Sequence, residues 1–265
     1  MHDLLRVFID PGTVFSSMKD DIKGVQPLLV LLLCVVVFTG AQPLFISDQA
    51  LIEQTEETVD SGLGMFNRIG KALLGEEAME EIKREVSAAA EAEGTTVDEL
   101  KEQAIADQTS PEQLQIIRIT SAIFSPVGAL IWLGLGVLIL ATYFNFAGTS
   151  GETRRPWADW FAFTLWSMMP VLVHYLLYLV VTIVTGEISP RSYLAPLAWL
   201  PGLQENAFAV NLTIGMIWAI WIQTVGLHRW LDRSIPVCLS IALVPWVIQW
   251  LIASGIAELT KAIGN

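Results

Sequence analysis

The chain has 265 residues, of which 53% are hydrophobic and only 16% are charged, and its mean hydropathy is +0.54. Such a mean is high for a water-soluble domain. The net charge of −12 is concentrated between Asp48 and Glu112, and the rest of the chain is close to neutral. The charge therefore gives no support to nucleic-acid binding.

Five uncharged runs are each long enough to cross a bilayer, which takes about 20 mostly apolar residues. We therefore predict an all-α polytopic membrane protein with a bundle of five transmembrane helices. The first span is expected at residues 24–47, and the other four lie within 116–257, at about 119–146, 160–185, 206–227 and 234–257. The first run is too long for the apolar part of a signal peptide, so we expect it to remain as a span.

The N-terminal segment, residues 1–23, is predicted to form a short amphipathic helix on the cytoplasmic side. Asp10 is a good N-cap, and Pro11 suits the first helical position. Apolar residues then share one face, at Val14, Phe15, Met18 and Ile22. The helix either packs on the bundle at headgroup level or presents a surface to a partner.

The acidic segment 48–115 reads as a helical insert between the first two spans. An apolar stripe repeats every seven residues at Ile52, Val59, Phe66 and Leu73, and such a stripe needs a surface to cover it. That surface belongs to the insert itself, to a second copy or to another protein. Thr96–Glu99 and Ser110–Gln113 are capping boxes, and the second should open a helix that continues into the next span. The acidic runs lack the spacing of a calcium loop.

Polar residues within the spans offer few chemical possibilities. Cys34 and Cys238 form neither a zinc nor a redox pattern, and we expect no cofactor. No Asp, Glu, Lys or Arg lies centrally in a predicted span, which argues against a proton-coupled transporter of the carboxylate type. No nucleophile–base spacing is present, so we expect no enzyme. His174 is either packed inside the bundle or part of a candidate polar membrane site formed with Tyr178, Asn145 and Gln223.

Basic residues in short loops predict the orientation of the chain. One side carries Arg6, Lys19, Lys23, Arg154, Arg155, Arg229 and Arg233, whereas the short segments of the other side offer only Arg191 and Lys261. We therefore expect a cytoplasmic N-terminus, an extracytoplasmic insert and an extracytoplasmic tail at 258–265. Arg154, Arg155, Arg229 and Arg233 are also candidate contacts for anionic lipids.

Three stretches together suggest a family. The hairpin between the last two predicted spans contains Ile217-Trp218-Ala219-Ile220-Trp221, Gly226-Leu227-His228-Arg229 and Ser234-Ile235-Pro236. The third span contains Leu165-Trp166-Ser167-Met168-Met169-Pro170, and the N-terminal segment contains Phe8-Ile9-Asp10-Pro11-Gly12-Thr13-Val14-Phe15. These elements resemble the Yip domain family, the Ypt/Rab-interacting membrane proteins. The resemblance covers most of the membrane part but not residues 48–115.

The resemblance implies a non-enzymatic membrane protein that acts through partners. The chain lacks the long cytosolic N-terminal region and the Asp-Leu-Tyr-Gly-Pro-type element of eukaryotic members, which favours a prokaryotic-type member in a bacterial cytoplasmic membrane. Our first hypothesis is a Yip-like protein that binds a protein partner, associates with itself or organises the bilayer, with Ile52, Val59 and Phe66 as the partner face. The alternative is a transporter or lipid-handling protein with a polar pathway through the bundle.

Overall fold

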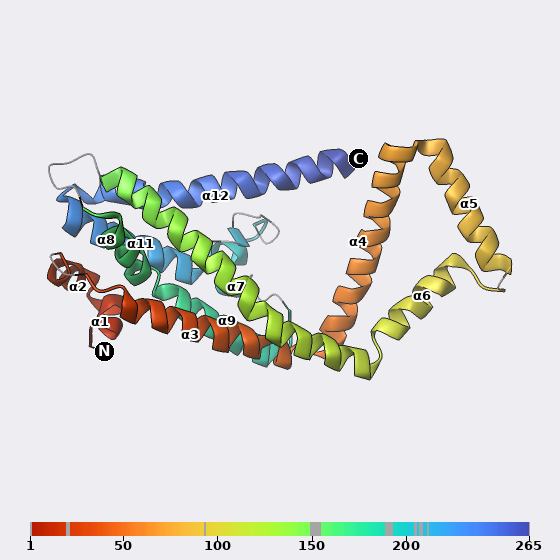
Figure 1. The fold of residues 1–265 in the computed structure, drawn as a ribbon, viewed down its shortest axis with the longest axis horizontal. Coiled ribbons are helices and arrows are strands. Elements are labelled where there is room, and N and C mark those ends of the chain that lie inside the picture. Colours follow the sequence, from red (N-terminus) through yellow and green to blue (C-terminus); the bar gives the residue numbers. More distant parts are fainter. Residues whose placement is uncertain are drawn as a thin grey trace.

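The computed structural model describes residues 2–19, 22–92, 94–148, 155–188, 193–203, 206, 209–210 and 212–264. Every regular element in these ranges is a helix. Figure 1 shows a bundle of long helices and, at one end of it, an arm formed by further helices. The predicted all-α architecture is confirmed.

The first half of the chain contains α1 (His2–Ile9), α2 (Pro11–Ser17), α3 (Val25–Ala41), the 3-10 turn η1 (Gln42–Phe45), α4 (Asp48–Leu74), α5 (Glu76–Ala92) and α6 (Val97–Gln108). The second half contains α7 (Pro111–Gly148), α8 (Trp157–Ser167), α9 (Pro170–Thr185), the turn η3 (Pro196–Trp199), α11 (Ile214–Leu231) and α12 (Ile235–Gly264).

Four helical segments within the described ranges are long and apolar enough to cross a membrane: Val25–Phe45, Pro111–Gly148, Trp157–Thr185 and Ile235–Ile252. The chain is therefore an integral membrane protein. Its surface fits this conclusion, because large apolar side chains such as Trp132 and Ile139 are exposed along α7, and exposed apolar surface of that extent marks a membrane contact.

The segment predicted as the fourth span differs from the expectation for 206–227. Its helix, α11, begins only at Ile214, after an N-cap hydrogen bond from the backbone of Met216 to the Thr213 hydroxyl. The helix continues to Leu231 and so includes His228 and Arg229 in its last turn. With 18 residues and a polar last turn, α11 is not among these four segments, and composition alone does not single it out as a span.

Several helix boundaries follow from local sequence signals, namely capping residues and proline. The capping box at Thr96 and Glu99 is present at the start of α6, and the Ser110 hydroxyl accepts a hydrogen bond from the backbone of Gln113 where α7 begins. As predicted, α7 then runs into the membrane part as one helix of 38 residues. Pro170 separates α8 from α9 because it lacks the backbone N–H that a continuous helix needs.

The arm consists of α4, α5 and α6. Helix α4 ends at Gly75, whose φ of 88° is accessible to glycine without strain. The root of the arm is attached to the bundle by a small apolar cluster of Ile46, Leu51 and Leu114. The backbone N–H of Ser47 also donates to the Gly186 carbonyl at 2.9 Å. These contacts hold the arm at the end of the bundle opposite to α1 and α2 (Figure 1).

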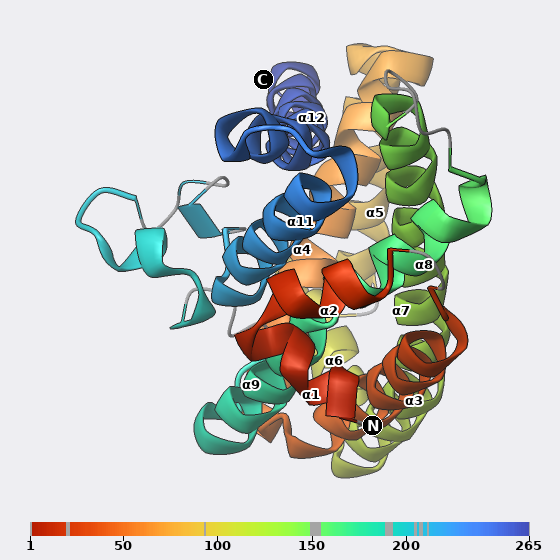
Figure 2. The same ribbon diagram turned by 90° about the vertical axis from the view of Figure 1, so that its left-hand side faces the viewer.

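The main core surrounds α11, which contacts α2, α8, α9 and α12. Figure 2 looks at the N-terminal end of the bundle, where α1 and α2 lie across it. Gly226 lets three elements meet on α11, because a methyl group added there would lie 2.6 Å from a ring carbon of Phe163 and 3.0 Å from one of Phe15.

We predict that Gly226→Ala lowers stability by about 1–3 kcal/mol, the usual cost of overpacking a core. Gly136→Ala on α7 is the matched control, since its added methyl group would meet no atom within 4 Å. The control should leave stability unchanged or raise it by up to about 1 kcal/mol through better helix propensity. Thermal unfolding in detergent measures both variants, and equal midpoints for the two would contradict this packing.

Candidate functional site

The N-terminal helix α2 is docked on α11 by apolar and polar contacts. Val14 and Phe15 are fully buried. The indole N–H of Trp230 donates a hydrogen bond of 3.2 Å to the Phe15 carbonyl, which would otherwise be an unpaired acceptor at a helix end. The structure thus favours the predicted helix that packs on the bundle over one that keeps its apolar face for a partner.

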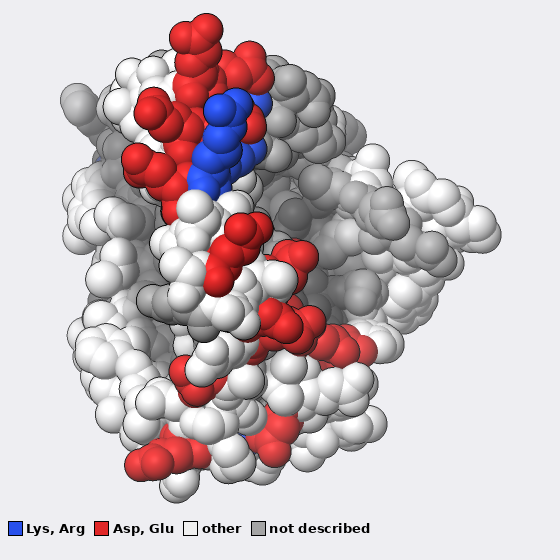
Figure 3. Space-filling model, turned by 90° about the vertical axis from the view of Figure 1, so that its right-hand side faces the viewer, with Lys and Arg blue, Asp and Glu red and all other residues white. Residues whose placement is uncertain are grey.

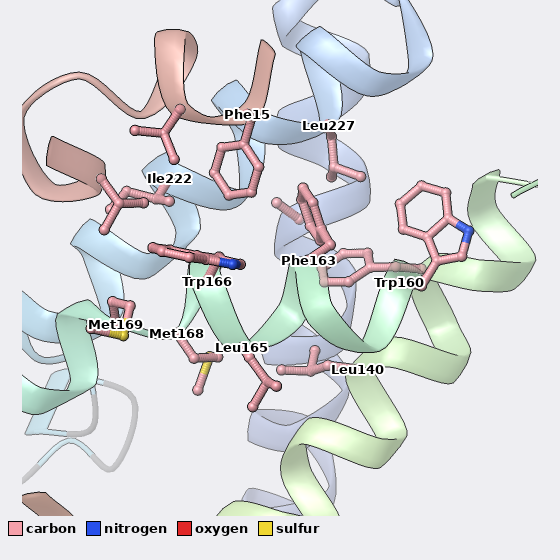
Figure 4. Close-up of a cluster of buried hydrophobic side chains, with 14 of the residues drawn as sticks. Phe15, Leu140, Trp160, Phe163, Leu165, Trp166, Met168, Met169, Ile222 and Leu227 are labelled. Atoms are coloured by element: carbon pink, nitrogen blue, oxygen red, sulfur yellow. The ribbon is translucent and has the colours of Figure 1, made fainter. Parts of the chain in front are cut away.

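Five rings from four helices form an aromatic cluster beneath α2: Phe15, Phe144, Trp160, Phe163 and Trp230. Ring centroids lie 4.9 Å apart for Phe163 and Trp230, 5.0 Å for Phe15 and Phe163 and 5.3 Å for Trp160 and Trp230. Figure 4 shows Phe15, Phe163 and Trp160 converging among the buried aliphatic side chains. Tilted and edge-to-face pairs at these distances stabilise a core beyond the area that they bury.

Arg155 covers this aromatic cluster. Its guanidinium lies 4.4 Å from the centre of a Trp230 ring and donates a hydrogen bond of 2.6 Å to the Lys19 carbonyl. Asp159 is 3.9 Å away, and only 15% of the Arg155 side chain is exposed. Arg155 therefore ties the segment after α2 to α8 and α11 through a cation–π contact and a charged hydrogen bond.

The other predicted lipid-contact arginines differ in position. Arg229 is exposed, and its side chain lies close to Gly12 of α2. The Arg233 carbonyl is 2.6 Å from the Nδ1 atom of His228, at the turn between α11 and α12. Arg154 lies outside the described residues. Contacts of these arginines with anionic lipids stay a prediction.

Of the four residues of the predicted polar membrane site, the structure brings His174 and Tyr178 together on α9, with ring centroids 6.0 Å apart, whereas Gln223 and Asn145 lie elsewhere in the bundle. His174 packs where α9 meets Gly215 of α11, eight residues and thus about 12 Å along that helix from Gln223. Gln223 is fully buried, beside the Met168 sulfur and 3.5 Å from the Trp246 indole nitrogen. Tyr178 donates to the Ile188 carbonyl near the arm, whereas Asn145 lies near the other end, in the last turn of α7. The structure therefore does not gather all four around one point.

The predicted partner face of the arm is divided between two environments. Ile52 packs against the apolar cluster at the root, and Val59 is half-buried. Beyond them the stripe is open, with 59% of Phe66 and 78% of Leu73 exposed. Leu63, which widens the stripe, is 49% exposed. The distal half of α4 therefore presents an apolar face.

The arm as a whole is acidic, although residues 61–74 of α4 contain no Asp or Glu and two basic residues, Arg68 and Lys71. Residues 48–115 contain seventeen acidic and five basic residues, and so carry a charge of −12, equal to that of the whole chain. Figure 3, which looks at the arm end, shows Asp and Glu side chains spread over the surface with few Lys or Arg between them. Among the described residues, no group of three or more His, Cys, Asp and Glu is placed to hold a metal ion.

One functional candidate was missed from the sequence. Arg118 on α7 lies at the edge of a cavity of about 210 Å³ at the arm end of the bundle. Its signal was visible as a basic residue directly before an apolar run. The position lies at the edge of a predicted span, and the partners that fold around it, Ile46 after η1 and Asp48 of α4, are distant in sequence.

The fold and surface define a helical integral membrane protein with a docked N-terminal helix and an acidic arm. Comparison with protein families adds the family: the model of the Yip1 domain matches residues 5–257. The chain therefore belongs to the Yip1 domain family, as its three sequence elements predicted. The matched range also includes the arm, residues 48–115, to which the resemblance of the three sequence elements did not extend. No curated protein and no solved structure matches the chain.

Docking of α2 should depend on the ionisation of Asp10. Hydrogen bonds from Thr13, with a smaller contribution from Arg6, hold the pKa of Asp10 below its usual value. A carboxylate whose folded pKa is lowered stabilises the folded state above its unfolded pKa of about 3.9, and this contribution is lost as the pH falls through the folded value.

We therefore predict that α2 loosens on acidification below about pH 4. The measurement uses a spin label on the exposed position of Ser16→Cys, in a chain whose Cys34 and Cys238 are replaced. Loosening of α2 increases the mobility of this label. Asp10→Asn is the matched control, because asparagine also caps helices but does not titrate. An acid transition of the same size in this variant would show that other groups control the docking.

Proposed function

We propose that this Yip1-family chain is a five-span protein of a bacterial cytoplasmic membrane that holds a protein partner on its extracytoplasmic arm. In this proposal the bundle anchors and orients the arm, and the chain catalyses no reaction. The observation that carries the proposal is the open apolar face of α4, formed by Leu63, Phe66 and Leu73 within a segment of charge −12.

The orientation is supported by the charges at the two ends of the bundle. Lys19, Arg155 and Arg229 gather around α2 and the end of α11, which suits the cytoplasmic side. Helix α3 leads from this end to the arm, so one crossing by α3 places the arm outside. When α11 also crosses the membrane, the chain has five spans, and the end of α12 lies on the same side as the arm.

Charge favours a different protein over a second copy of the arm. Two arms would bring together surfaces that each carry −12, and like charges brought into contact are costly. Anionic lipid headgroups are disfavoured for the same reason. The complementary occupant is a protein segment, such as an amphipathic helix, that places apolar side chains on Phe66 and Leu73 and basic side chains toward the acidic residues elsewhere on the arm.

We predict that Phe66→Glu or Leu73→Glu removes the partner without unfolding the chain, because both side chains are mostly exposed. Burial of an unpaired charge in an interface costs several kcal/mol, so co-isolation should fall at least about tenfold. The measurement is affinity isolation from native membranes in mild detergent, with quantitative mass spectrometry of the co-purifying proteins.

Glu57→Gln is the control, since Glu57 is exposed and lies nine residues before Phe66, on the opposite face of the helix. It should retain the partner. If both stripe variants retain every co-purifying protein at the wild-type level, the arm is not the binding surface.

A further inference from the structure

The cavity beside Arg118 lies where the apolar spans end. It is bounded by η1, the first turns of α4, helix α7 and the residues that follow α9, and its volume is about 210 Å³. Sites for drug-sized ligands have volumes of about 300–1,000 Å³, so this cavity suits a smaller group. Since α3 and α9 both end beside it, its place corresponds to the level of lipid headgroups.

Arg118 contributes a charge that is only partly satisfied within the protein. Its guanidinium donates a hydrogen bond of 2.8 Å to the Ile46 carbonyl and pairs with the Asp48 carboxylate. Its Nε–H is buried and has no acceptor among the described residues. A buried charged donor without an acceptor costs more than a neutral one, which points to an acceptor that arrives with a ligand.

Further polar groups line the same cavity. Ser121 and Ser125 follow Arg118 on one face of α7, at spacings of three and seven residues, and the Gln54 side chain lines the cavity from α4. Tyr178 and Gln42 form a fixed wall, because both donate to the Ile188 carbonyl, at 3.1 and 3.0 Å. The cavity therefore offers an arginine, two hydroxyl groups and an amide to one small polar group.

We propose that this cavity binds the headgroup of a zwitterionic phospholipid of the phosphoethanolamine type. The phosphate accepts hydrogen bonds from the Arg118 Nε–H and from the hydroxyls of Ser121 and Ser125, a donor set typical of phosphate sites. The ammonium group lies toward the carboxylate of Asp48, and the acyl chains extend along the apolar outer face of α7.

The balance of charges selects this headgroup over an anionic one. Arg118 is already paired with Asp48, so the site is neutral and presents both signs. An anionic lipid would meet Asp48 and the negative field of the arm without a cation to compensate them. A headgroup that carries its own ammonium group satisfies both members of the Arg118–Asp48 pair. This proposal does not depend on the arm binding a protein.

Native mass spectrometry of the full chain in detergent tests the proposal. The purified protein is titrated with dioleoyl phosphatidylethanolamine and, separately, with dioleoyl phosphatidylglycerol, which has the same acyl chains and a net negative headgroup. We expect tighter binding of the ethanolamine lipid. Arg118→Gln and the double variant Ser121→Ala/Ser125→Ala should each weaken it about tenfold, as expected for lost hydrogen bonds to a charged group.

The double serine variant keeps the ties of Arg118 to Ile46 and Asp48, so it remains informative if Arg118→Gln does not fold. Arg84→Gln, at an exposed position on α5, removes one charge elsewhere and should bind like the wild type. Unchanged affinity for the ethanolamine lipid in the double serine variant overturns the proposal, and so does equal or tighter binding of the glycerol lipid.

Soluble competitors separate a lipid headgroup from a free phosphate group. Phosphoethanolamine should displace the lipid at lower concentration than inorganic phosphate, because only the former carries the ammonium group that faces Asp48. Displacement by inorganic phosphate at the same or lower concentration would assign the cavity to free phosphate and overturn the lipid proposal.

Discussion

The burial of α11 is the constraint on which the rest of the bundle depends. Its Gln223 and Thr224 side chains are completely buried, and an unsatisfied polar group costs several kcal/mol away from water. Each is provided with partners: Thr224 donates to the Ile220 carbonyl, and Gln223 meets Met168 and Trp246. Helices α8 and α12, which flank α11, are therefore needed to cover the polar side chains of this helix, which elsewhere exposes Ile217 and Trp221.

The same helix explains why the N-terminal segment is part of the fold. The end of α11 carries Trp230, whose indole N–H is satisfied by the carbonyl of Phe15 and whose ring is covered by Arg155. Gly226, one turn earlier, makes room for Phe15 itself. Loss of α2 would expose an apolar and partly polar surface at this end, so the docked helix covers the end of the bundle core.

The two ends of the molecule are physically different. The N-terminal end is closed by aromatic packing and paired charges, whereas the arm end has an acidic surface, an open apolar face on α4 and a polar cavity at the root. In a membrane protein of the Yip1 family, this asymmetry supports a division in which the bundle anchors the chain and the arm end meets partners. The proposed lipid site lies between these regions and would couple the root of the arm to the bilayer.

Local sequence signals predicted much of this architecture. The capping residues of α2 and α6 and the long apolar runs depend on neighbouring residues, which a single sequence displays. What the sequence could not show depends on distant contacts. Arg118 is a site candidate only because Ile46 and Asp48 fold against it, and Gln223 is an internal packing residue because Trp246 and Met168 surround it. The start of α11 at Ile214 could not be predicted either, because the residues before it are uncharged, like the first turns of the helix.

Cysteine accessibility in intact cells tests the proposed arrangement most directly. In a chain with Cys34 and Cys238 replaced, single cysteines are placed at Ser16, at Glu57 of the arm and at Gly255 of α12, and are treated with a membrane-impermeant thiol reagent. The account predicts labelling from outside at positions 57 and 255 and, only after permeabilisation, at position 16. Protection of position 255 together with position 16 would show that α11 does not cross, and protection of position 57 would contradict the extracytoplasmic arm.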